Sequence, residues 1–208
     1  MDPRIACFCN WPLLQPRDCL LHIIAYHAAP VLEEHKPSVI LTFSNSEARR
    51  LSDWWLEYQD DIPAGRLQHY ELCRSGEGIT VLFYDPDLLA RVLEEKAAAR
   101  FLRSRGYGQS LTVESALAVL RSKYQAGCPH EIGLFLGIPL ADVQGFIRFE
   151  GKHALANGYW KVYHDPERQL ALFARFHEAK LGFIRFILAG HPAGEYLSGG
   201  RLTTADGM

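Results

Sequence analysis

Residues 128–147 read CPHEIGLFLGIPLADVQGFI. Apolar residues recur at helical spacing on both sides of Gly137-Ile138-Pro139, which predicts two short helices joined by a tight turn. In this arrangement Cys128 is the N-cap of the first helix and residues 129–131 form its first turn. Pro129 suits the first helical position, and Glu131 can reach back to the N-cap amide. The stretch therefore predicts a helix-turn-helix-like segment, within a helical subsegment over residues 112–150.

The flanking segments predict an α+β fold. Ser38–Phe43 is short and β-branched, as expected of a buried strand. Two further strands flank the Gly-bearing loop at residues 75–78, the pattern of a β-hairpin, and YWKVY at 159–163 alternates as a fourth strand does. Helices are expected over residues 19–29, 45–58, 86–103, 112–124 and 166–188. We expect a single α+β domain over residues 1–189, with a small mixed sheet of about four strands covered by helices, and a flexible tail over residues 190–208.

Composition narrows the classes of function. The 208 residues are 48% hydrophobic and 22% charged, which is typical of a globular protein with a substantial core. The net charge of −2 argues against a nucleic-acid partner and against an anionic membrane surface. No apolar run reaches the roughly 18 residues of a membrane helix. Five cysteines, an odd number, favour reduced thiols in the cytoplasm.

The polar residues at the start of the 128–147 stretch are the candidate catalytic or metal-binding residues. The positive end of a helix dipole favours a Cys128 thiolate and a neutral His130 imidazole, which is a good metal ligand. With Glu131 they could form a metal or nucleophile cluster, with His130 and Cys128 as the metal ligands. Capping alone also accounts for Pro129 and Glu131, so this stretch is either a site or a helix cap.

Three motifs resemble those of an uncharacterised bacterial family, a domain of unknown function. They are the 128–147 stretch, GYWKVY at 158–163, and the His27-Ala28-Ala29-Pro30 block with Lys36. The chain departs from the family pattern at Ile138, where an aromatic residue is expected. The resemblance draws attention to His27, Lys36, Lys161 and Tyr163 as ligand-binding candidates, and it implies no reaction.

Three functions remain open. The first is binding of a small molecule, a metal or an iron- or haem-related cofactor at the Cys/His/Glu/Lys residues, with catalysis left undecided. The second is a DNA-binding regulator built on the helix-turn-helix-like segment, although Asp142 near the start of its second helix would face the phosphates. The third is a protein-interaction or homo-oligomerisation module with Trp54, Trp55 and Tyr159 at its surface.

Overall fold

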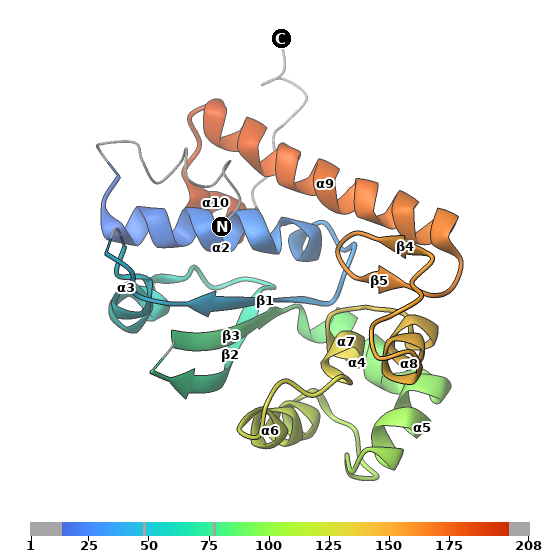
Figure 1. Cartoon of the computed structure of the whole chain (residues 1–208). Coiled ribbons are helices and arrows are strands. Elements are labelled where there is room, and N and C mark those ends of the chain that lie inside the picture. Colours follow the sequence, from blue (N-terminus) through green and yellow to red (C-terminus); the bar gives the residue numbers. More distant parts are fainter. Residues whose placement is uncertain (1–13, 48, 77, 200–208) are drawn as a thin grey trace.

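The computed structural model describes residues 14–47, 49–76 and 78–199 (Figure 1). Its centre is an antiparallel sheet in the order β1-β3-β2, formed by β1 (Ser38–Phe43), β2 (Gln68–Ser75) and β3 (Gly78–Tyr84). The α+β class is confirmed, and β2 and β3 form the expected hairpin. The sheet itself is smaller than expected and antiparallel throughout. Of the YWKVY strand, only β5 (Lys161–Val162) is formed, and it pairs with β4 (Ala156–Asn157) as a separate two-stranded sheet.

The middle strand, β3, is buried on both faces because helices cover both sides of the sheet. Side chains alternate along a strand, so Ile79, Val81 and Phe83 contact one hydrophobic core, while Leu82 and Tyr84 contact another. The apolar run ITVLFY is the pattern of a strand covered on both faces.

The first helical layer contains α2 (Pro16–Leu32), α3 (Leu51–Tyr58), α9 (Pro166–Leu188) and α10 (Ala193–Leu197), with a short 3₁₀ helix at Gln59–Asp61. In Figure 1, α2 lies between the sheet and α9. As its composition predicts, α2 is buried nearly all round. Trp55 of α3 is fully buried and stacks on Phe43, which counts against an interaction surface built on the tryptophans.

The second layer consists of α4 (Pro86–Glu94), α5 (Lys96–Ser104), α6 (Val113–Tyr124), α7 (Ile132–Phe135) and α8 (Leu140–Arg148). Local capping signals set several boundaries. Thr112 and Ser115 form a capping box at α6, and the Asp165 side chain caps α9 ahead of Pro166. The single helix expected over 86–103 is instead two helices, because Glu95 adopts an extended conformation between them.

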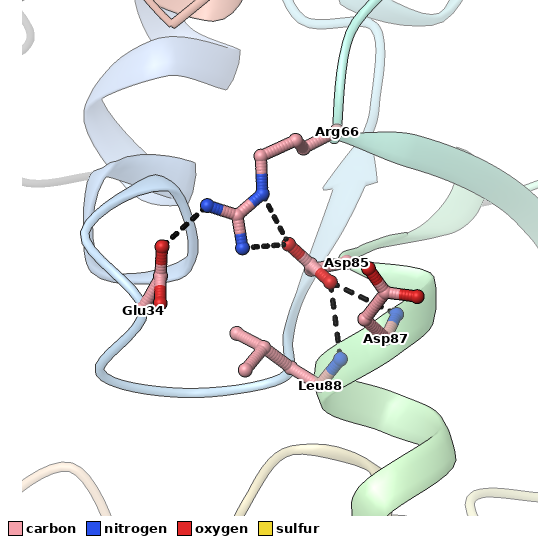
Figure 2. A network of polar contacts seen from close by, with 5 residues as sticks. All are labelled: Glu34, Arg66, Asp85, Asp87 and Leu88. Carbon is pink, nitrogen blue, oxygen red and sulfur yellow. Dashed lines mark hydrogen bonds and ion pairs between the residues drawn. The ribbon is translucent and has the colours of Figure 1, made fainter.

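Buried Asp85 joins three parts of the fold, as Figure 2 shows. Its Oδ1 accepts hydrogen bonds from the amides of Asp87 and Leu88 at the start of α4, both at 3.0 Å. Its Oδ2 lies 2.7 Å from an Arg66 guanidinium nitrogen, and Arg66 also pairs with Glu34 in the loop after α2. This network ties the end of α2 and the start of β2 to α4.

Within the segment expected to be a flexible tail, residues 193–197 form the short helix α10. Ala193, Tyr196 and Leu197 are buried, and the Tyr196 ring packs edge-on against Phe183 and Phe186 of α9. The apolar side chains in a Gly-rich segment therefore anchor it to the core. Residues 1–13, at the start of the expected domain, and residues 200–208, at the end of the expected tail, lie outside the described residues. Within the described ranges, no helix is both long and apolar enough to cross a membrane.

Candidate functional site

The start of the 128–147 stretch differs from its predicted structure. Helix α7 begins only at Ile132 and contains four residues, so Cys128 is not its N-cap. Residues 129–134 are instead joined by tight turns, in which the amides of Ile132, Gly133 and Leu134 bond to carbonyls three residues earlier. So short a helix has little dipole, and it lacks the feature expected to act on Cys128 and His130.

Tertiary contacts of Glu131 explain this difference. Its carboxylate is buried and lies 3.0 Å from Nζ of Lys123 on α6, so it does not bond back to the chain as a capping residue would. The Lys123 ammonium also lies 5.4 Å above the ring of Tyr107. Glu131 is therefore a structural anchor between the loop and α6 rather than part of a cluster with Cys128 and His130.

Cys128 and His130 do share a pocket, and Lys161 joins them there. The pocket has a volume of about 320 Å³ and lies between the α7–α8 segment and the β4–β5 hairpin. Its walls are mostly apolar, and the polar side chains that line it are few. The lining consists of Cys128, Pro129, His130, Ile132, Gly133, Leu136, Ile138, Asp142, Val143, Phe146, Trp160 and Lys161.

Each of the three polar residues is held by a described neighbour. Burial, and secondarily the neighbouring Cys128 thiol, raises the pKa of Tyr124 to about 12, so Cys128 lies beside Tyr124. The His130 ring meets the Phe146 ring edge-on, with centroids 5.3 Å apart. Lys161 Nζ donates to the Gly151 carbonyl at 2.6 Å. An exposed thiol, an exposed imidazole and an ammonium therefore reach one apolar pocket.

Asp142 is the residue that sequence reasoning missed. Its buried carboxylate accepts hydrogen bonds from Trp160 Nε1 at 2.8 Å and from the backbone amides of Tyr163 and His164 at 2.7 and 2.9 Å. These three donors fix the β4–β5 hairpin against α8 and so build one wall of the pocket. The available signal was an acidic residue in the first turn of an apolar helix, which we interpreted only as unfavourable for DNA binding.

The motif glycines of this region are explained by close packing. A Cβ on Gly145 would lie 2.5 Å from the Tyr163 side chain, and a Cβ on Gly158 would overlap the Phe173 ring. A Cβ on Gly133 would lie 2.8 Å from Val143 on α8. Gly137 has a φ of +78° and lies against Pro37, where an L side chain would be both strained and obstructed. The glycines allow α7, α8 and the hairpin to approach one another.

The other ligand-binding candidates lie outside this pocket. The Tyr163 ring stacks on Phe149, and its buried hydroxyl has no hydrogen-bond partner among the described residues. His27 of α2 meets Tyr26 edge-on, and the Lys36 ammonium lies 5.4 Å from the Phe176 centroid. Among the sequence candidates, Cys128, His130 and Lys161 line the pocket, whereas Tyr163, His27 and Lys36 each have other neighbours.

The structure bears on two further hypotheses. Among residues 14–47, 49–76 and 78–199, no group of three or more His, Cys, Asp or Glu side chains could hold a metal ion. Cys128 and His130 alone are fewer donors than a protein zinc site supplies. Helix α8, which was expected to be the second helix of the helix-turn-helix-like segment, buries Asp142, Val143 and Gly145 against its neighbours.

Comparison with known proteins places the chain in a family. A family model described as "Protein of unknown function (DUF3793)" matches residues 24–195. Neither the search of curated proteins nor the search of solved structures produced a match. The matched region runs from the middle of α2 into α10, and it contains the whole pocket. The chain therefore belongs to this family of proteins of unknown function.

Proposed function

We propose that this protein binds a small, mainly apolar organic molecule in the pocket between the α7–α8 segment and the β4–β5 hairpin. The observation that supports this is the convergence of Cys128, His130 and Lys161 on one apolar pocket from two distant parts of the chain. Ligand sites commonly combine apolar walls with a few directed polar groups, and about 320 Å³ lies at the lower end of their roughly 300–1,000 Å³ range.

The chemistry of the lining specifies the ligand further. Leu136, Ile138 and Val143 offer aliphatic contacts, and Phe146 offers the edge of an aromatic ring. Lys161 supplies a positive charge to the lining, and its ammonium donates one hydrogen bond, to the Gly151 carbonyl. A ligand with a flat apolar body and one anionic group would match both features. We include no bound metal ion in this proposal, because the described donors do not form a metal site.

The test uses 8-anilinonaphthalene-1-sulfonate, a probe with an aromatic body and one sulfonate, in a fluorescence titration of the full chain. Wild-type protein should show one saturable site. Ile138→Trp fills the pocket and should abolish it, whereas Lys161→Met removes the ammonium and should weaken it about tenfold or more. Lys152→Met, a surface lysine paired with Glu150, is the matched control and should bind as wild type does. Undiminished binding by Ile138→Trp would refute the proposal.

A further inference from the structure

Helix α5 carries a row of positive charges on its exposed side. Lys96, Arg100 and Arg103 follow one another at spacings of four and three residues, so they lie along one face of the helix. All three are exposed, and Arg105 extends the row just beyond the helix end. The opposite face buries small or apolar residues, Ala98, Ala99 and Leu102. In Figure 1, α5 lies at the outer edge of the second helical layer, so the α5 row, defined by its four cations, faces away from the core.

The α5 row has no internal counter-ions. Cations elsewhere in the protein do pair with carboxylates, as Arg66 does with Asp85 and Lys123 with Glu131. No carboxylate among residues 14–47, 49–76 and 78–199 forms an ion pair with any of the four cations of the row. The acidic residues just before the helix, at positions 94 and 95, are exposed and are no exception. The charge of the row is therefore left for solvent or for an external anion.

The sequence of α5 is also unfavourable for an isolated helix. Lys96 occupies the first helical position, where the positive end of the helix dipole repels a cation, and the first turn contains no acidic residue. The side chain of the N-cap residue, Glu95, makes no capping hydrogen bond. Lys96 and Arg100 are like charges four residues apart, which further destabilises a helix. Local rules broken without internal compensation are typical of functional surfaces, and an external anion would offset both defects.

Two guanidinium groups of the row are held in place without being neutralised. Arg103 donates from Nε and from one Nη to the Gln109 carbonyl, at 3.3 and 3.2 Å. The Arg105 guanidinium lies 5.1 Å from the centroid of the Phe101 ring. A guanidinium has five N–H donors, so Arg103 keeps donors with which it can bind a carboxylate. Because these side chains are already positioned, less entropy is lost when a partner binds.

We propose that the α5 row is a docking surface for an acidic helical segment of a partner protein. Carboxylates spaced by four and three residues on that segment would meet Lys96, Arg100 and Arg103, which lie within about 10 Å along the axis of α5. Arginine suits this role because its planar guanidinium binds a carboxylate through two parallel hydrogen bonds. This surface is separate from the Cys128 pocket and does not depend on the function proposed for that pocket.

The surroundings of the row favour a protein over a nucleic acid. Glu94 and Glu95 are exposed at the N-terminal end of α5, and the whole chain has a net charge of −2. Duplex DNA presents an unbroken line of phosphates, about one charge per 1.7 Å, and some of them would meet these glutamates. A peptide places its carboxylates only at chosen positions, so it can pair with the row and leave the glutamates uncovered.

The experiment measures fluorescence anisotropy of a fluorescein-labelled helical peptide whose glutamates have the spacing of Lys96, Arg100 and Arg103, titrated with the full chain. A peptide with glutamines at those positions is the reference. Wild-type protein should bind the glutamate peptide, and Arg100→Gln combined with Arg103→Gln should weaken binding at least about tenfold. The matched control combines Arg148→Gln with Arg168→Gln, which removes two exposed arginines without ion pairs elsewhere on the surface, and it should bind as wild type does.

A charge exchange gives a second measurement that misfolding cannot imitate. Arg100→Glu combined with Arg103→Glu should lose the glutamate peptide and bind a lysine peptide of the same spacing. The proposal is overturned if wild-type protein does not prefer the glutamate peptide over the glutamine peptide. It is also overturned if the Arg100→Gln and Arg103→Gln variant, folded by circular dichroism, binds as wild type does. Tighter binding of labelled duplex DNA than of the glutamate peptide, lost in the same variant, would assign the row to phosphates and equally refute an acidic protein partner.

Discussion

Replacing Asp142 by asparagine tests how the pocket wall is held. An asparagine whose oxygen faces the amides of Tyr163 and His164 keeps both backbone hydrogen bonds, but without the charge. In the wild type, Trp160 Nε1 donates to the second Asp142 oxygen at 2.8 Å. The NH₂ group of the asparagine would take the place of that oxygen, so that two donors would oppose each other. Losing a charge-assisted hydrogen bond costs about 1.5–3 kcal/mol, and a buried unsatisfied donor adds to this. We expect Asp142→Asn to lower the free energy of unfolding by about 3 kcal/mol.

A double-mutant cycle with Trp160→Phe separates this contact from the others. Trp160→Phe removes the indole donor, so in that background Asp142→Asn no longer opposes two donors and should cost only about 1 kcal/mol. The assay is urea unfolding followed by far-ultraviolet circular dichroism, because the fluorescence of Trp160 is lost in two of the variants. Costs of the two single substitutions that add to within about 0.5 kcal/mol, as they do for sites that do not interact, would contradict the opposition of the two donors.

Three other substitutions have expected outcomes set by the structure. Gly145→Ala should destabilise the fold by about 1–3 kcal/mol in urea unfolding, because the new methyl meets Tyr163. Gly182→Ala on α9, whose new methyl would meet the Arg185 side chain at an ordinary contact distance of 4.0 Å, should stabilise the fold by up to about 1 kcal/mol. Tyr107→Phe should leave stability unchanged or raise it by about 1 kcal/mol, since the buried Tyr107 hydroxyl has no hydrogen-bond partner among the described residues; a loss of more than about 1 kcal/mol would contradict this. Burial, and secondarily the charge of Lys180, lowers the pKa of Lys36 from 10.5 to about 8. The folded state of the wild type releases the Lys36 proton at about pH 8 and the unfolded state only near 10.5, so wild-type stability should rise with pH across that window. Lys36→Met should therefore be more stable than wild type at pH 7, and this advantage should shrink above pH 8. If the unfolding temperatures of the variant and the wild type differ by the same amount from pH 7 to 10.5, Lys36 does not carry a buried charge.

Sequence reasoning succeeded where the signal is local. Thr112 with Ser115, Asp85 with Pro86, and Asp165 with Pro166 each start a helix as predicted, because a cap and its partners lie within a few residues. The hairpin around residues 75–78 was predictable for the same reason. The α+β class follows from these elements taken together.

Sequence reasoning failed where a partner lies far along the chain. Glu131 has the right spacing for a capping box, but it pairs with Lys123 of a different helix. Asp142 binds donors that are 18 to 22 residues later, so no local pattern reveals its role. The candidate site was predicted in part: Cys128, His130 and Lys161 meet in one pocket, whereas Glu131 and Lys36 have separate surroundings.

The most direct test of the proposed pocket is the rate at which iodoacetamide alkylates Cys128, read by peptide mass spectrometry with and without saturating 8-anilinonaphthalene-1-sulfonate. Cys128 is exposed and lines the pocket, while the half-buried Cys73 on β2 serves as an internal reference. If the probe occupies this pocket, alkylation of Cys128 should slow at least about tenfold while that of Cys73 stays constant. An unchanged rate at Cys128 under saturating probe would contradict the account, because the ligand would then be bound elsewhere.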